Sequence, residues 1–318
     1  MIHFFKLVRP INLLIILLTM YGTRFYILQF HSHSKVDDNP FNFALLVLST
    51  LFIAAAGNII NDYFDVKADR INKPEKLILT KHVKRRYAII SHWALNLAAF
   101  GIGCYLSYYY GELSFAFIHL VSINILWFYS MVLKRKPLIG NLLIAGLTGM
   151  IPLLVAIYFR AGNYSTEIYN SFDPSTWVTP IDYSFVYLLA FFAFIQNLIR
   201  EVIKDAQDIP GDQLIYVKSL PMLIGLKTTL FFTLPFLLIL PVVYCYVFFK
   251  YFLINKGISA YLIISLPFLL SAFINLFLIG YIIMKREHSS LKLVDRLIKI
   301  TMLVGVLSTF HLGYFFHA

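Results

Sequence analysis

Nine apolar runs, each close to the length of a membrane crossing, alternate with polar segments along the chain. A helix needs about 20 apolar residues to span the hydrocarbon core of a bilayer. Of the 318 residues, 59% are hydrophobic and only 14% are charged, which is a membrane-protein composition. We therefore predict an all-α, polytopic membrane bundle that forms one domain over residues 1–318. The nine predicted spans are 11–30, 41–61, 87–109, 113–133, 139–159, 183–200, 228–249, 258–284 and 293–317.

Lysine and arginine side chains gather in alternate polar segments. The segment 62–86 holds the largest group, and the segments on the other side of the predicted membrane hold few. Because positively charged loops stay in the cytoplasm, we predict a cytoplasmic N-terminus and a multi-pass protein of the cytoplasmic (inner) membrane. This topology, together with attraction to acidic lipids, accounts for the net charge of +11. The charge gives no reason to expect a nucleic-acid partner.

Six aspartates form two triplets that share the spacing i, i+3, i+7, and each triplet follows an apolar run. The first is Asp62, Asp65 and Asp69, and the second is Asp205, Asp208 and Asp212. On a helix these positions fall within about 60° of one another, so each triplet predicts an acidic stripe about 10 Å long. We call them the first and second acidic stripes. Carboxylates at a membrane edge are costly unless they are paired or bind cations, and two facing stripes suit Mg²⁺ held against a phosphate.

A simpler interpretation is that the stripes are solvated helix ends with ordinary surface charge. The chain has 16 acidic residues, and seven of them, Glu201 included, fall in these two short segments. The other segments on that side of the predicted membrane are almost purely basic. This concentration favours an active site at the cytoplasmic side of the bundle.

Several motifs surround the stripes. They are Asn61-Asp62-x-x-Asp65-x-x-x-Asp69, Asp208-x-x-x-Asp212, Tyr129-Ser130-x-x-Leu133-Lys134 and Gly140-Asn141. Together they resemble the motifs of the UbiA superfamily of intramembrane prenyltransferases, whose nine spans also match, so the resemblance covers essentially the whole chain. One difference follows Asn72-Lys73-Pro74, where many members carry an Arg-Pro pair and this chain reads Glu75-Lys76-Leu77. The difference weakens the case for diphosphate contacts from that loop.

The resemblance implies a Mg²⁺-dependent enzyme that transfers a polyprenyl group from a prenyl diphosphate to a hydrophobic acceptor and releases diphosphate. Metal and protein cations between the stripes would neutralise the diphosphate and lower the barrier to allylic C–O cleavage. The implied metal ligands are Asn61, Asp62, Asp65, Asp69, Asp205, Asp208 and Asp212, with Asp62 and Asp205 as direct ligands or as supports for them. The implied catalytic residues are Asp65, Asp69, Asp208 and Asp212. The implied diphosphate-binding residues are Arg70, Tyr129, Ser130, Lys134 and Lys204.

Two features of this assignment have open alternatives. Each of the cations Arg70, Lys134 and Lys204 could instead be ordinary loop charge of the cytoplasmic side. The developing allylic cation needs a dry, aromatic-rich cavity. The 30 Phe and 21 Tyr of the chain could supply it, although most of them must face lipid or pack in the core.

The acceptor would meet the start of the first span. Arg9-Pro10-x-Asn12 stands at the predicted cytoplasmic edge, and Arg9 could hold a carboxylate or a phosphate or could simply anchor the helix. In the resemblance, Arg9 and Asn12 approach the acceptor. The combination of this motif with the second stripe is most similar to the branch that alkylates geranylgeranylglycerol phosphate, a prenyl ether lipid. The alternative is the branch that prenylates 4-hydroxybenzoate or another aromatic quinone precursor.

Two other protein classes also place carboxylates in membrane helices. A cation-coupled transporter carries them near the bilayer midplane at broken helices, whereas these stripes lie at helix ends on one side. A phosphatidyltransferase of the CDP-alcohol type uses a single aspartate run rich in Gly and Ala with its second half close behind. The sequence has no such run, so both classes are disfavoured.

Overall fold

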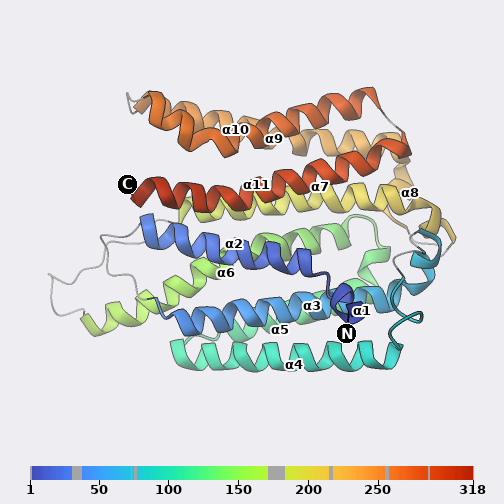
Figure 1. The fold of residues 1–318 in the computed structure, drawn as a ribbon, viewed down its shortest axis with the longest axis horizontal. Helices are drawn as coiled ribbons and strands as arrows, with labels where there is room; N and C mark the ends of the chain where they lie inside the picture. The colour runs from blue at the N-terminus through green and yellow to red at the C-terminus, as the bar shows by residue number, and fades with distance from the viewer. Residues whose placement is uncertain are drawn as a thin grey trace.

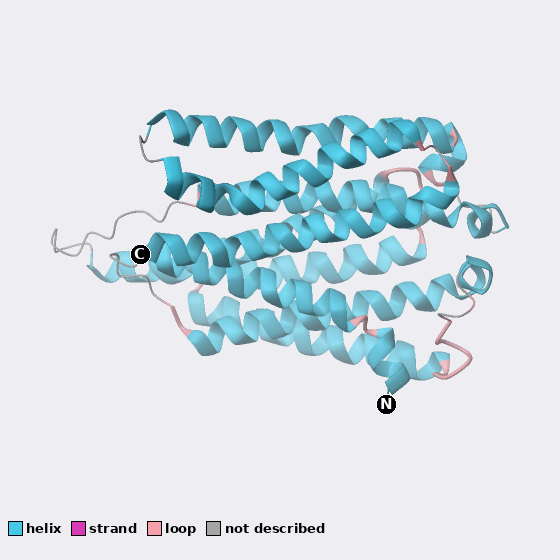
Figure 2. Ribbon diagram, turned by 45° about the horizontal axis from the view of Figure 1, so that its top comes forward, coloured by secondary structure: helices cyan, strands magenta, loops and turns pink. Residues whose placement is uncertain are grey.

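The computed structural model describes residues 2–30, 38–72, 74, 77–170, 183–214, 218–254, 258–285 and 287–317. Over these ranges the fold is helical, as predicted, and its one β feature is an isolated bridge between Leu79 and Val83 (Figures 1 and 2). The chain is a bundle of long helices that run along one common axis.

The described residues contain nine long helices and four short ones. The long helices are α2 (Pro10–Phe30), α3 (Pro40–Asn72), α4 (Arg85–Tyr110), α5 (Ser114–Met131), α6 (Ile139–Asn170), α7 (Ser184–Leu214), α9 (Leu226–Ile254), α10 (Ile258–Met284) and α11 (Leu291–His317). The short ones are α1 (Ile2–Leu7), η1 (Leu133–Arg135), α8 (Leu220–Ile224) and η3 (His288–Ser290). In chain order, each predicted span corresponds to one long helix.

Eight of the long helices are long and apolar enough to cross a membrane, judged over the described residues. The ninth, α11, is not among those eight, but it lies inside the bundle against α2, α7 and α10. Gly22 of α2 makes this close approach possible, because a Cβ there would stand 2.1 Å from Oγ1 of Thr309 on α11. The count of nine spans stays a prediction. The N- and C-termini lie at opposite ends of the bundle axis (Figure 1), as an odd number of crossings requires.

Two of the long helices continue past the predicted membrane edges. The predicted spans end at residues 61 and 200, whereas α3 runs to Asn72 and α7 to Leu214. Both aspartate triplets therefore lie on continuous helix, and the prediction that each forms a stripe on one helix is confirmed. Hydropathy marks where the apolar surface stops, and a helix needs no apolar surface to continue into a polar region.

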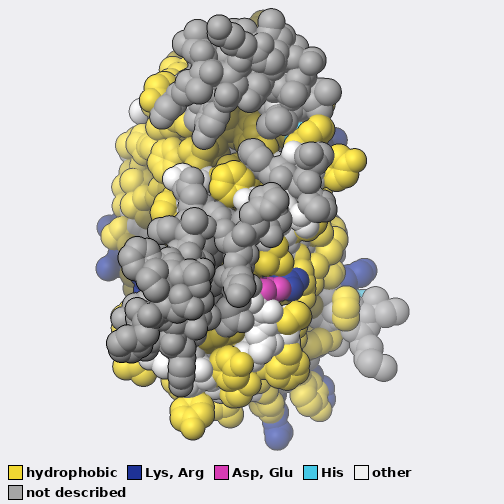
Figure 3. All heavy atoms as spheres, turned by 90° about the vertical axis from the view of Figure 1, so that its left-hand side faces the viewer, with side chains coloured by type: hydrophobic (Ala, Val, Ile, Leu, Met, Phe, Trp, Pro, Cys, Tyr) yellow, Lys and Arg dark blue, Asp and Glu magenta, His cyan; other side chains and the backbone are white. Residues whose placement is uncertain are grey.

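The two ends of the bundle differ in charge. The stripes lie at the end that carries α1 and α8 (Figure 1). At the opposite end, acidic and basic atoms adjoin among hydrophobic side chains (Figure 3). There Arg24 of α2 binds Asp38 through two contacts, Nε–Oδ1 at 3.0 Å and Nη2–Oδ2 at 2.5 Å. The pairing keeps two charges of the predicted outer face neutralised.

The orientation in the membrane can be tested with single cysteines. After Cys104 and Cys245 are replaced by serine, Lys81→Cys should react with an impermeant maleimide only from the cytoplasmic face. Leu113→Cys, which is 81% exposed in the α4–α5 turn, should react only from the other face. Labelling of both positions from one side would contradict the alternating topology.

Candidate active site

The two acidic stripes lie on neighbouring helices. α3 and α7 contact each other, and all six aspartates are half-buried. Lys134 lies within electrostatic range of Asp65 in the first stripe and of Asp208 in the second. The structure therefore brings the stripes to one site, at the same end of the bundle.

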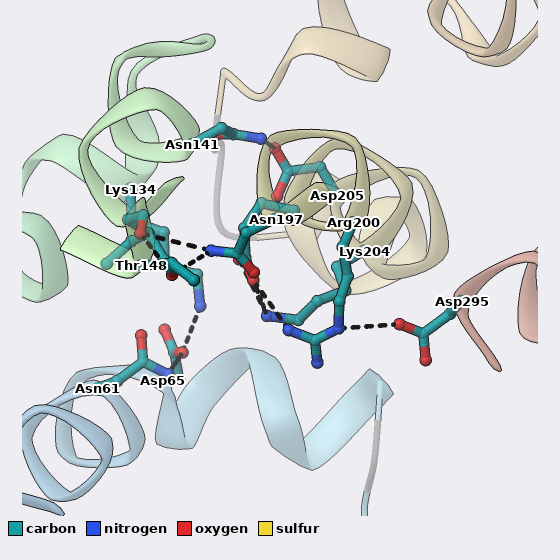
Figure 4. A network of polar contacts seen from close by, with 12 residues as sticks. Asn61, Asp65, Lys134, Asn141, Thr148, Asn197, Arg200, Lys204, Asp205 and Asp295 are labelled. Atoms are coloured by element: carbon teal, nitrogen blue, oxygen red, sulfur yellow. Dashed lines mark hydrogen bonds and ion pairs between the residues drawn. The ribbon is translucent and has the colours of Figure 1, made fainter. Parts of the chain in front are cut away.

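Asp65 is held by two donors. Nδ2 of Asn61 donates to its Oδ2 at 2.8 Å, and the ammonium of Lys134 forms an ion pair with the same oxygen (Figure 4). Burial lowers the pKa of Lys134, but the acidic groups around it, Asp65 foremost and then Tyr129 and Asp208, together outweigh burial, and the pKa is raised. Lys134 thus carries a positive charge that faces the first stripe. This is the position expected for a diphosphate-binding cation.

Lys134 owes its place to the tight turn between α5 and α6. The backbone N–H of Lys136 donates to the carbonyl of Leu133 at 3.0 Å, which closes η1. Gly140 lies beneath this turn, where a Cβ would stand 3.0 Å from the Leu133 oxygen and 3.1 Å from Cα of Lys134. Leu138 has a φ of 63°, a conformation that costs a non-glycine residue about 1 kcal/mol. The turn is strained and closely packed, so the backbone at Lys134 is held in place.

Gly140→Ala should therefore lower turnover. The added methyl group pushes against backbone atoms, which move by a few tenths of an ångström and displace Lys134. We expect a fall in kcat of about tenfold, since a 1 Å misplacement can cost about 100-fold. The matched control is Gly146→Ala on the same helix, where a Cβ meets no atom within 4 Å. Equal activity of the two variants would show that the packing of η1 does not position the site.

Asp62 is bound by Arg9. Nη2 of Arg9 donates to Oδ1 of Asp62 at 2.5 Å. Arg9 lies between α1 and α2 with a φ of 56°, and this segment is fixed by a hydrogen bond from Nδ2 of Asn58 to the Val8 carbonyl at 3.0 Å. Burial lowers the pKa of Arg9, but Asp62, together with Asp65 and Glu201, outweighs burial, and the pKa is raised. Arg9 is therefore a charged member of the site.

The second stripe is supported from α6 and from within α7. Nδ2 of the buried Asn141 donates to Oδ2 of Asp205 at 2.8 Å (Figure 4). Nζ of Lys204 donates to both carboxylate oxygens of Glu201, each at 3.0 Å. Glu201 is only 6% exposed, so its charge depends on these partners. The sequence showed Asn141 only as part of a motif and Glu201 only as one of the clustered acids; neither was assigned a role.

A further arginine links this group to α11. Nη1 of Arg200 lies 3.4 Å from Oε1 of Glu201, and its Nε lies 3.3 Å from Oδ1 of Asp295 (Figure 4). Asp295 also pairs with Lys299 one turn later, at 2.5 Å. Asp295 is 95 positions from Arg200 in the chain, so only the fold reveals this contact.

The other predicted site residues are Asp69, Asp208, Asp212, Tyr129 and Arg70. Asp69, Asp208 and Asp212 each take part in a polar or electrostatic interaction within the protein. Tyr129 is half-buried near Lys134 and Asp205. Arg70 is exposed.

Two predicted site residues, Ser130 and Asn12, make hydrogen bonds within their own segments of the chain. Ser130 donates its hydroxyl to Leu126 of its own helix at 2.9 Å. Asn12 is exposed, and its backbone N–H donates to the Arg9 carbonyl at 2.9 Å. Of the loop that departs from the family pattern, Lys73, Glu75 and Lys76 lie outside the described residues.

The donor chemistry of the site fits Mg²⁺. Among the described residues, no three His, Cys, Asp or Glu side chains are grouped closely enough to hold a metal by themselves. Mg²⁺ is usually bound by one or two carboxylates together with water and substrate phosphates, so it does not need an all-protein cage. The carboxylate and amide oxygens of the two stripes are ligands of this kind. Asp62 and Asp65 are already occupied by cationic side chains, which marks the first stripe as a place where positive charge binds.

Comparisons with known proteins agree with this site. The chain is 30% identical to digeranylgeranylglyceryl phosphate synthase of Methanobrevibacter smithii over 276 residues, which cover 85% of this chain and 86% of the relative. It is 36% identical to the synthase of that name from Thermococcus kodakarensis over 186 residues, which cover 58% and 57% of the two chains.

Solved structures share the fold. One, described as giving "structural and mechanistic insights into the biosynthesis of digeranylgeranylglyceryl phosphate synthase in membranes", has a TM-score of 0.62 at 21% identity and covers 97% of this chain and 96% of its own. A UbiA homologue from Archaeoglobus fulgidus, bound to DMAPP and Mg²⁺, has a TM-score of 0.58 at 18% identity and covers 98% and 99%.

The model of the UbiA prenyltransferase family matches residues 16–293. The resemblance inferred from the motifs is confirmed, and the chain is a multi-pass membrane protein that belongs to the UbiA prenyltransferase family.

Proposed function

We propose that this enzyme transfers a polyprenyl group, most simply geranylgeranyl, from its diphosphate to the free hydroxyl of geranylgeranylglycerol phosphate. The acceptor is inferred from the 30% identity with a digeranylgeranylglyceryl phosphate synthase over 85% of this chain. The site supports the same reaction, because its cations and carboxylates can hold a diphosphate and a second anion side by side. Residues 1–318 would form the single catalytic domain.

The reaction exchanges one C–O bond for another. The bond between C1 of the prenyl chain and the diphosphate oxygen breaks, and the acceptor hydroxyl oxygen bonds to C1. The hydroxyl proton leaves, and the stripe carboxylates are the bases that this site offers. Asn61 and the stripe aspartates would hold Mg²⁺, which when bound would supply positive charge to neutralise the leaving diphosphate.

Cationic side chains of the protein would bind both substrates. Lys134 and Lys204 would place positive charge beside the leaving diphosphate, where it favours the transition state over the ground state. Arg9 would hold the acceptor phosphate, since a guanidinium suits a phosphate through two parallel hydrogen bonds. In the resting structure Lys134 and Arg9 bind Asp65 and Asp62 instead. Substrate oxygens would therefore compete with these two carboxylates for Lys134 and Arg9 or share the two cations with them.

An acceptor panel tests the proposal. Purified enzyme in lipid vesicles is given geranylgeranyl diphosphate, Mg²⁺ and either geranylgeranylglycerol phosphate or 4-hydroxybenzoate, and products are identified by mass spectrometry. We expect the diether phosphate from the first acceptor and no prenylated ring from the second. Prenylation of the aromatic acid alone would replace this assignment with the quinone-precursor reaction.

The role of Arg9 predicts a selective kinetic effect. Arg9→Gln should raise the KM for the phosphate-bearing acceptor by roughly 10- to 150-fold, the worth of one charge-assisted hydrogen bond. The KM for prenyl diphosphate should change little. Because the substitution also removes the partner of Asp62, Arg9→Gln/Asp62→Asn serves as the charge-matched control. Equal losses for both substrates in Arg9→Gln would reduce Arg9 to a structural partner of Asp62.

A further inference from the structure

A groove of about 560 Å³ lies between α5 and α6 on the outer surface of the bundle. Its wall on α5 and η1 extends from Leu120 to Leu133, and Leu143 of α6 forms the other side. The part of this wall on α5, from Leu120 to Met131, covers about 17 Å, slightly more than half of a 30 Å hydrocarbon core. The groove thus has the length of one lipid chain in one leaflet. Asn124 is the single polar side chain in its lining.

The groove ends at a basic turn. Leu133, its last lining residue, begins η1, and Arg135 and Lys136 follow directly with exposed side chains. Within the described chain, neither of these two cations pairs with an acidic side chain. The backbone of Lys218 lies beside this turn, because its N–H donates to the Arg135 carbonyl at 3.2 Å. The third cation of the turn, Lys134, faces away from this surface and binds Asp65.

We propose that this groove binds one acidic membrane lipid, with a chain along α5 and the headgroup at Arg135 and Lys136. An apolar groove alone would accept any lipid. The unpaired cations at its mouth supply the preference for negative charge, since basic pockets between membrane helices select acidic headgroups. The bound headgroup lies one residue from Lys134, so the lipid also braces the strained turn that positions this lysine.

Native mass spectrometry of the intact enzyme tests the proposal. Protein without substrate or metal is titrated with phosphatidylglycerol and phosphatidylcholine of equal chain length, and the retained molecules are counted. We expect one phosphatidylglycerol to bind more tightly than phosphatidylcholine. In Arg135→Gln/Lys136→Gln its affinity should fall about 30-fold, because each cation near a lipid surface is worth about fivefold.

Two controls distinguish a specific lipid-binding site from general attraction of lipid to surface charge. Lys292→Gln/Arg296→Gln removes the same charge from exposed positions on α11 and should leave the affinity unchanged. Asn124→Trp fills the groove and should abolish the tight site, whereas Leu97→Trp, at a position on α4 that is 74% exposed, should not.

Three outcomes would overturn the proposal. The first is unchanged binding in Arg135→Gln/Lys136→Gln or in Asn124→Trp, and the second is an equal loss in the α11 control. The third is a dimer that Asn124→Trp disrupts, which would make a second copy of the chain the occupant. Because no substrate is present, none of these results depends on the proposed function.

Discussion

Removal of divalent metal should abolish prenyl transfer, and Mg²⁺ should restore it. Two stripes of carboxylates would otherwise repel a diphosphate, and the few cations at the site are already paired with Asp62, Asp65 and Glu201. The measurement is product formation after exhaustive EDTA treatment, followed by titration with Mg²⁺. We expect activity below detection and then full recovery.

The control for this experiment is to measure whether the fold is unchanged after metal removal. Helical content and melting temperature should be the same with and without EDTA, because protein cations occupy the first stripe when metal is absent. Activity that persists in EDTA and does not rise with Mg²⁺ would rule out a metal-bridged diphosphate and leave Lys134, Lys204 and Arg9 as its sole counter-charges.

Asp65→Asn should lower kcat by at least about 100-fold, the usual cost of losing a group that stabilises transition-state charge. The same size of effect is expected for Asp208→Asn on the second stripe. Side-chain volume hardly changes, so packing should persist. Stability is a separate matter at Asp65, because the substitution leaves the Lys134 ammonium without its ion-pair partner and should lower the melting temperature.

A double variant separates these two effects. Asp65→Asn/Lys134→Gln removes both charges of the pair, so its melting temperature should recover toward the wild-type value while its activity stays low. If activity returned together with stability, Asp65 would be a structural partner of Lys134 and no part of the catalytic machinery.

The sequence predicted the elements that carry the site better than the contacts inside it. The i, i+3, i+7 spacing placed Asp62, Asp65 and Asp69 on one helix face, and α3 has this form. Apolar runs located each long helix but not its end, because α3 and α7 continue beyond the apolar surface. Helix periodicity is local, so a sequence records it directly.

Pairwise contacts depend on how distant helices meet. The hydrogen bond from Asn141 to Asp205 joins α6 to α7, and that of Arg9 to Asp62 joins the α1–α2 turn to α3. Periodicity contains no information about either contact. Lys134 was identified through family resemblance, since loop position alone fitted topological charge equally well. For Ser130 the motif implied diphosphate binding, and the structure adds a hydrogen bond from its hydroxyl to the Leu126 carbonyl within α5.

The ion pairs of Arg9 and Lys134 also bear on which metal species the enzyme takes up. A bare divalent ion that approached Asp62 or Asp65 would be repelled by the cationic side chain that already binds one oxygen of that carboxylate. A metal ion that arrives with a diphosphate brings anionic oxygens that offset this repulsion. We therefore expect Mg²⁺ to bind this site more tightly in the presence of a diphosphate than alone.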